Sequence, residues 1–287
     1  MRAGLVALLA GLALGAVPAA AGDDSVLLAT TTSVRDSGLL GALLPTFSER
    51  TGIRVRVVAV GTGAALRLGA EGNADLLLTH APQAEEELVA SGAAASRTPF
   101  MENHFVLGGP PEDPAGVRQA ASPEEAFRRI AAAQAPYASR ADDSGTHKRE
   151  KALLEAAGLD PAGGWPGFAR TGSGMALTLQ VAGERRAYVL SDAGTFLAFQ
   201  EHTGLVALSQ PVPALRNVYA LLRVSPERFP RVRAEGARKL EAFFLERATQ
   251  ERIAGFGRER FGRPLFRPLL LEPTPVGEHA DPPQGAP

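Results

Sequence analysis

The sequence predicts an α/β protein of two lobes, in which parallel-rich sheets are flanked by helices. Two observations lead to this prediction. Strand candidates alternate along the chain with segments of helical periodicity, which is the pattern of parallel strands covered by helices. The proline-rich stretch Pro110-Pro-Glu-Asp-Pro114 then interrupts this alternation and separates one α/β series from a second.

The first lobe is predicted to alternate strands with helices. Its strand candidates are runs of apolar or β-branched residues at 25–29, 53–60, 75–79 and 105–107. Its helix candidates repeat apolar residues on one face, over 37–50 and over a shorter segment that ends at Ala70. Gly52 is expected to end the first of these helices.

The second lobe is predicted to repeat the alternation. Helices are expected at 123–133, after Ser144 and after the turn 172–174, with strands at 137–139 and 187–190. A strand at 218–222 is expected to return the chain to the first lobe, and helical segments at 233–250 and 253–257 follow it.

These elements divide the chain at the proline-rich break and at the return strand. We expect lobe 1 to comprise 22–107 and the return segment 217–271, with lobe 2 between them over 108–216. The tail, 272–287, is rich in proline and glycine and is expected to be flexible.

The N-terminus has the pattern of a secretory signal peptide. Met1 and Arg2 precede an apolar run over 3–17, and the small residues that follow favour cleavage after Ala21. The apolar run is short for a membrane span. We therefore expect 1–21 to be removed and the mature protein to lie in the periplasm.

Composition narrows the classes of function. A formal net charge of −1 over 287 residues provides no general attraction for nucleic acid. The absence of cysteine excludes disulfides, thiolate metal sites, a cysteine nucleophile and a lipid anchor on an N-terminal cysteine. Any preference for an anion must therefore come from a local site.

Four polar turns follow strand candidates, at 30–33, 61–63, 143–146 and 172–174. In parallel α/β sheets, ligands bind beyond the carboxyl ends of the strands, where helix N-termini also point. Hydroxyls and backbone N–H groups in these turns donate hydrogen bonds, and the nearby Arg140 cannot accept one. The turns therefore predict a site between the lobes for a small, fully deprotonated oxyanion, although 143–146 can also serve as a simple helix cap.

Several spaced motifs in one order resemble those of a single family. They are Thr30-Thr-Thr-Ser33, Gly61-Thr-Gly-Ala-Ala-Leu66, Gly72-Asn-Ala-Asp-Leu-Leu-Leu-Thr-His-Ala81, Ser139-Arg-Ala-Asp-Asp-Ser-Gly-Thr-His-Lys148 and Tyr188-Val-Leu-Ser-Asp192. Over roughly 26–199, they resemble the tungstate-binding proteins of bacterial tungstate ABC transporters. Ala141 stands where that family more commonly has glycine.

This resemblance implies a fold, a ligand and partners. The fold is the type II periplasmic-binding-protein fold, with a hinge of two crossing strands. The ligand is tungstate, with molybdate as the alternative, held in the cleft between the lobes without covalent chemistry. The partners are a membrane permease and the cytoplasmic ATPase that powers it, while the binding protein itself is expected to be a monomer that needs no cofactor and no metal cation.

The candidate ligand residues come from all four turns. They are Thr31, Thr32, Ser33, Thr62, Arg140, Ser144, Gly145, Thr146, Ser173 and Gly174. Arg140 and Thr146 match the arginine and threonine of the family's Ser-Arg-x-Asp-Asp-Ser-Gly-Thr motif, and 31–33 matches its first-lobe turn. Arg140 can present a planar cationic fork to an anion.

Two alternatives stay open at this point. Ser144 and His147 lie within one helical turn, so a serine hydrolase that uses them as nucleophile and base is the rival from another class. The nearer alternative is a different oxyanion: molybdate, sulfate or phosphate. His80 argues against phosphate, because similar phosphate-binding proteins place there an aspartate that accepts the phosphate proton. The histidine is then either structural, bonded to backbone, or a ligand contact.

Overall fold

A computed structural model describes residues 25–271 of the chain. The predicted signal peptide, 1–21, and the predicted flexible tail, 272–287, lie outside the described residues. None of the helices within 25–271 combines the length and the apolar composition of a membrane span.

A mixed sheet runs through the molecule with the strand order β2-β1-β3-β9-β4-β7-β5-β6, and the short strands β8 and β10 pair with β4 outside this order. The strands are β1 (Ser25–Thr31), β2 (Arg54–Val60), β3 (Leu76–Thr79), β4 (Ala94–Gly109), β5 (Tyr137–Ser139), β6 (Phe168–Arg170), β7 (Tyr188–Asp192), β8 (Val206–Ala207), β9 (Arg216–Val224) and β10 (Arg267–Pro268). The parallel pairs lie at the two ends of this order, where β1 pairs with β2 and β3, and β5 pairs with β6 and β7.

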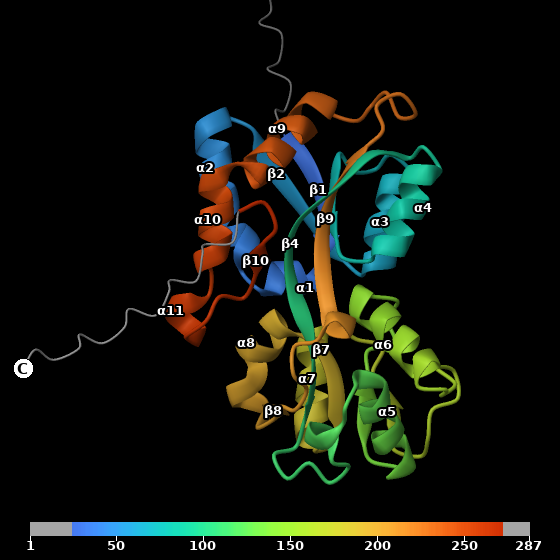
Figure 1. Ribbon diagram of the computed structural model, residues 1–287. Coiled ribbons are helices and arrows are strands. Elements are labelled where there is room, and N and C mark those ends of the chain that lie inside the picture. Colours follow the sequence, from blue (N-terminus) through green and yellow to red (C-terminus); the bar gives the residue numbers. More distant parts are fainter. Residues whose placement is uncertain (1–24, 272–287) are drawn as a thin grey trace, which may run out of the picture.

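Two long strands connect the two ends of the sheet. Most of β4 pairs antiparallel with β9, as far as His104 opposite Arg216, and its last part pairs antiparallel with β7 from Phe105 onward. Figure 1 shows β4 and β9 running side by side from the upper half of the molecule into the lower half. The two crossing strands that the resemblance implies are therefore present.

We call the half that holds β1, β2 and β3 lobe 1, and the half that holds β5, β6 and β7 lobe 2. The predicted lobe boundaries fall inside β4, after residue 107, and at the first residue of β9, Arg216. They stay predictions, because both strands run through the two halves without a break.

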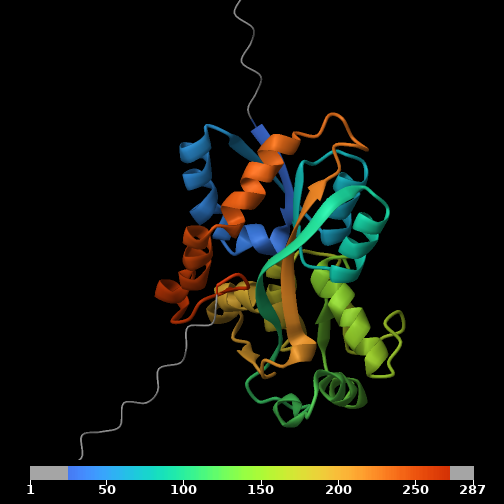
Figure 2. The ribbon, with the colours of Figure 1, turned by 45° about the horizontal axis from the view of Figure 1, so that its top comes forward.

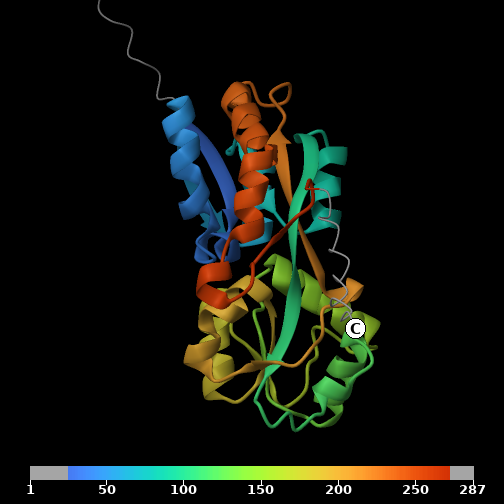
Figure 3. The ribbon, with the colours of Figure 1, turned by 60° about the vertical axis from the view of Figure 1, so that its left-hand side comes forward.

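Helices cover both faces of the sheet in each lobe (Figures 2 and 3). The helices are α1 (Thr32–Asp36), α2 (Leu39–Thr51), α3 (Thr62–Ala70), α4 (Pro82–Ala90), α5 (Pro123–Ala132), α6 (Gly145–Ala156), α7 (Met175–Glu184), α8 (Ala193–Thr203), α9 (Ala234–Leu245), α10 (Arg247–Gly255) and α11 (Arg258–Phe261). In lobe 1, α2, α9 and α10 share one apolar core and α3 and α4 share another. In lobe 2, α5 and α6 pack in one core and α7 and α8 in a second.

The longest strand differs most from its prediction. The sequence predicts a strand over 105–107, whereas β4 has 16 residues. Polar side chains such as Glu102 and Asn103 interrupt the apolar pattern that predicts a strand, although both residues are buried. Pro99 lies at a shift in the β4–β9 register, where a missing N–H is tolerated.

The C-terminal helices also differ from their prediction. The expected helical segment 233–250 is divided into α9 and α10 at Glu246, whose extended backbone (φ −66°, ψ 145°) interrupts the helix. The sequence does not predict the helices α1, α4, α8 and α11 or the strands β6, β8 and β10. The remaining predicted strands and helices are found within a few residues of their expected positions.

Candidate functional site

Hydroxyl groups at the end of β1 form part of the site on lobe 1. Thr31 is buried, and its Oγ1 caps α1 by accepting the N–H of Val34 at 3.4 Å. The Oγ of the buried Ser33 lies 3.1 Å from that of Thr31. Thr32, between them, is half-buried. Two of the three predicted hydroxyls of this turn are therefore buried side by side.

Thr62 connects the two lobes. It is fully buried at the start of α3, and its Oγ1 accepts the N–H of Gly145, the first residue of α6, at 2.8 Å. Gly61 also approaches lobe 2, since a Cβ added there would lie 3.4 Å from the carbonyl oxygen of Asp142. The N-termini of α3 and α6 thus meet across the lobe boundary, and the Gly145 N–H, predicted as a ligand donor, bonds to Thr62.

Arg140 follows the last residue of β5, and only 2% of its surface is exposed. Its Nη2 donates to Oδ2 of Asp142 at 2.5 Å, while Oδ1 of Asp142 accepts the N–H of Ser144 at 3.2 Å. Its Nε is buried without a hydrogen-bond partner. A buried donor without a partner costs about 1–3 kcal/mol, so Nε is a natural contact for an anion.

The first turn of α6 supplies further polar groups. Ser144 is the N-cap, and its Oγ accepts the N–H of His147 at 3.2 Å. Thr146 is fully buried, and its Oγ1 has no hydrogen-bond partner. Asp143, which the sequence offered as an alternative cap, instead pairs with Lys148 at 3.3 Å near the surface. The positive end of the helix dipole adds to the attraction for an anion here.

The backbone between β5 and α6 is strained at two residues. Ala141 and Asp143 have φ values of 47° and 57°, in the left-handed region that favours glycine. The more common glycine of the resembling family fits the conformation of Ala141. Strained backbone of this kind is concentrated at ligand sites, where surrounding contacts hold it in place.

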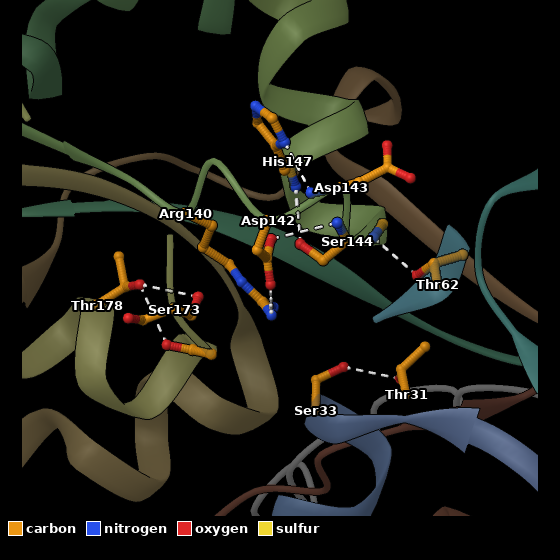
Figure 4. Close-up of polar contacts among 12 residues, drawn as sticks. Thr31, Ser33, Thr62, Arg140, Asp142, Asp143, Ser144, His147, Ser173 and Thr178 are labelled. Atoms are coloured by element: carbon orange, nitrogen blue, oxygen red, sulfur yellow. Dashed lines mark hydrogen bonds and ion pairs between the residues drawn. The ribbon is translucent and has the colours of Figure 1, made fainter. Parts of the chain in front are cut away.

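The fourth predicted turn is less well placed for a ligand. Ser173 is half-buried, and its Oγ donates to the carbonyl of Thr171 at 3.0 Å. Gly174 is exposed at the N-terminus of α7. In Figure 4, Ser173 and Thr178 lie on the side of Arg140 that faces away from Thr62.

Figure 4 shows how the remaining residues converge. Arg140, Asp142 and Ser144 from lobe 2 face the hydroxyls of Thr31, Ser33 and Thr62 from lobe 1. Asp142 was missed as a site residue, because the sequence does not say that a carboxylate two positions after an arginine will bond to it. Within residues 25–271, no group of three or more histidine, aspartate and glutamate side chains could hold a metal ion.

His80 bonds to a side chain, and not to backbone as one of the two alternatives expects. Its Nδ1 lies 2.9 Å from Oδ1 of Asn217, a side chain of β9, rather than bonding to backbone. Burial lowers the pKa of His80 below its ordinary value, while the nearby Asp192 acts in the opposite direction. The buried ring is therefore a neutral imidazole at neutral pH.

The geometry does not favour the serine hydrolase. The Nδ1 of His147 accepts the N–H of Asp143 at 3.1 Å, and the Oγ of Ser144 accepts the backbone N–H of His147. Each side chain is thus engaged with backbone. Burial also lowers the pKa of His147, although Asp142 opposes this effect.

A buried carboxyl group of α6 bonds to the strand that precedes Arg140. Glu150, in α6, accepts hydrogen bonds from the Ser139 hydroxyl and from the Tyr137 hydroxyl, the latter at 3.0 Å. Both hydroxyls belong to β5, directly before Arg140. Burial raises the pKa of Glu150 to about 7. This cluster fixes the end of β5 against α6.

Comparisons with known proteins find relatives over most of the chain. The profile of the PBP superfamily domain matches residues 17–247. The chain is 41% identical to the tungstate-binding protein TupA of Peptoclostridium acidaminophilum, over 88% of this chain and 89% of that protein. Among solved structures, it is 38% identical to TupA of Desulfovibrio alaskensis, with a TM-score of 0.74 and coverage of 85% and 98%. It is 40% identical to a crystal structure described as the tungstate ABC transporter of Geobacter sulfurreducens, with a TM-score of 0.72 and coverage of 79% and 96%.

Proposed function

Because the chain belongs to the family of TupA tungstate-binding proteins, within the PBP superfamily, we propose that it captures tungstate between its two lobes for an ABC importer. It is a substrate-binding protein and not an enzyme, as the family indicates. The observation that carries the assignment of the site is a pair of buried atoms without partners, Nε of Arg140 and Oγ1 of Thr146. Both belong to the segment from β5 to the first turn of α6.

Both lobes contribute groups that would bind the anion. Arg140 supplies the positive charge and at least one N–H, and Asp142 holds Nη2 of its guanidinium so that the fork is oriented before the anion arrives. Thr146 supplies a hydroxyl donor at a helix N-terminus. Thr31 and Ser33 supply hydroxyls from lobe 1, so that a bound anion is held by both lobes at once.

The charge state of the anion is the reason we expect weaker binding of phosphate. Tungstate carries no proton at neutral pH and only accepts hydrogen bonds, whereas phosphate retains a proton that needs an acceptor. Asp142 accepts one hydrogen bond on each of its carboxylate oxygens, from Arg140 and from the Ser144 N–H. The candidate ligand groups, the Arg140 guanidinium and the hydroxyls of both lobes, can all donate, which suits an anion that only accepts, so we expect tungstate to bind more tightly than phosphate.

The location and partners follow from the family and from the N-terminal sequence. Export through cleavage after Ala21 would place the mature chain in the periplasm as a soluble monomer. There it would deliver the anion to a permease of the inner membrane, which a cytoplasmic ATPase powers.

Isothermal titration calorimetry tests this function. The full-length mature protein, from residue 22, is titrated with sodium tungstate, molybdate, sulfate and phosphate at equal pH and ionic strength. We expect saturable binding of tungstate at one site, no binding of phosphate at comparable concentrations, and a molybdate affinity that measures selectivity between two similar dianions. Tight phosphate binding with no heat from tungstate would overturn the proposal.

A further inference from the structure

The ring of His80 lies in a buried cluster between the two lobes. The residue follows β3 and has 5% of its surface exposed. Its ring stacks on Tyr219 of β9, with 4.9 Å between ring centroids, and packs near Phe105 of β4. Burial of the ring explains the neutral imidazole, and Asp192 and Arg140 are the charged groups that act on it from lobe 2.

The same ring lies directly against Gly145. A Cβ added to Gly145 would lie 2.5 Å from Cε1, 2.8 Å from Nδ1 and 2.9 Å from Nε2 of His80. All three distances are shorter than real Cβ contacts. Gly145 does not have the left-handed φ that would itself demand glycine. The imidazole therefore leaves no room for a side chain at this position.

This contact joins lobe 1 to the anion-binding end of α6. Gly145 lies between Ser144 and Thr146 in the first turn of α6, and His80 belongs to lobe 1. Through Nδ1, His80 also bonds to Asn217, whose Nδ2 donates to Oδ1 of Asn103 at 2.8 Å. Asn103 and Asn217 face each other on the two crossing strands, β4 and β9. A continuous set of contacts therefore connects the α6 N-terminus with the strands about which the lobes would move.

We propose that His80 is a positioning residue for lobe closure, whose ring is the surface against which Gly145 rests when the lobes come together around the anion. The proposal rests on the function proposed above, since it assigns His80 a role in the same site without contact to the anion. Asn217 holds the ring in its orientation, and the Thr62–Gly145 hydrogen bond forms beside it. The closed position of α6 is thus set by a side chain of lobe 1.

Substitutions of Gly145 and His80 test this role. Gly145→Ala places a methyl group against the ring and should hold the lobes apart, with about tenfold weaker tungstate binding and a larger radius of gyration by small-angle X-ray scattering. His80→Ala in the same chain removes the obstacle, so the double variant should regain most of the compactness and affinity that the single change loses. Gly41→Ala is the matched control, because that helical glycine has open space around it.

The outcomes separate the proposal from its premise. A double variant that stays as open and as weak as Gly145→Ala would overturn the role of His80, as would a Gly145→Ala protein that closes and binds like the parent. If Gly145→Ala does not fold, His80→Ala must restore folding, because the same clash is removed. If the parent protein gives no heat with tungstate, the proposed function fails. If the parent binds tungstate and becomes more compact with it, but the variants do not behave as stated in the presence of tungstate, only the role of His80 fails.

Discussion

At the residue scale, Arg140 is the proposed ligand residue on which the expected affinity depends most. Its guanidinium is buried, one side bonds to Asp142, and Nε is left for a ligand. A charge-assisted hydrogen bond in a dry site is roughly twice as strong as a neutral one. Since the fork is already oriented, little side-chain entropy is lost when the anion binds.

Arg140→Ala is therefore expected to weaken tungstate binding by on the order of 2 to 5 kcal/mol. Arg140→Lys should recover only part of this loss, because an ammonium group cannot reproduce a planar fork. Calorimetry measures both, and Arg185→Ala, which removes an exposed arginine of the same charge, should leave affinity unchanged. An Arg140→Ala protein that folds and binds tungstate as tightly as the parent contradicts the assignment.

The sequence predicts individual site residues better than their pairings. Arg140 and Thr146 follow from a motif, and the structure places both in buried positions. The bond between His80 and Asn217 joins residues 137 positions apart, and no local pattern indicates it. The Thr62–Gly145 bond between the lobes cannot be predicted from the sequence either, because it depends on how two helix N-termini meet.

At the scale of elements, the union of β5 with α6 determines where the site residues point. Glu150 accepts the hydroxyls of Tyr137 and Ser139 and so fixes the strand end that precedes Arg140. Burial raises the pKa of the Glu150 carboxyl from 4.5 to about 7. The folded protein therefore retains a proton that the unfolded chain releases between these two values.

Glu150→Gln is expected to change the pH dependence of stability. In the parent, the free energy of unfolding should fall as pH rises from about 4.5 to about 7 and then level off. The amide removes this loss, so the variant should be more stable than the parent at pH 8 by up to about 3 kcal/mol, and similar at pH 5. Denaturant titrations across this range measure the effect, with exposed Glu155→Gln of the same helix as control. Identical pH profiles for parent and Glu150→Gln would rule out this role.

Elements with a clear period are predicted well, and elements that mix polar with apolar residues are not. The sequence predicts α2 because its apolar residues repeat on one face, and the structure buries that face. By contrast, the sequence predicts only the last apolar residues of β4, because the polar Glu102 breaks the apolar pattern. In the structure Glu102 is buried and bonds to Arg216 and Arg267 on neighbouring segments. A charged residue that is buried with partners cannot be told from an exposed one by its local pattern.

At the scale of the whole molecule, the fold explains why a chain with almost no net charge can bind an anion. Two strands cross between the lobes, and the carboxyl ends of the parallel strands in both lobes face one boundary. Alternation predicts the α/β class of both halves. The proline-rich stretch 110–114, which was expected to link the lobes, instead follows the end of β4 within lobe 2, where Tyr188 donates to Asp113 at 3.0 Å. Neither feature predicts the sheet that continues through both lobes along β4, because the change of partner from β9 to β7 depends on tertiary packing.

The most direct test of the whole account is to locate tungsten by anomalous X-ray diffraction in crystals grown with tungstate. The account predicts one strong peak at the lobe boundary, with the anion's oxygens within hydrogen-bond distance of Arg140 Nε and Thr146 Oγ1 on one side and of the Thr31 and Ser33 hydroxyls on the other. A tungsten atom found elsewhere, such as in the cavity of about 570 Å³ between α4 and α6, would contradict it.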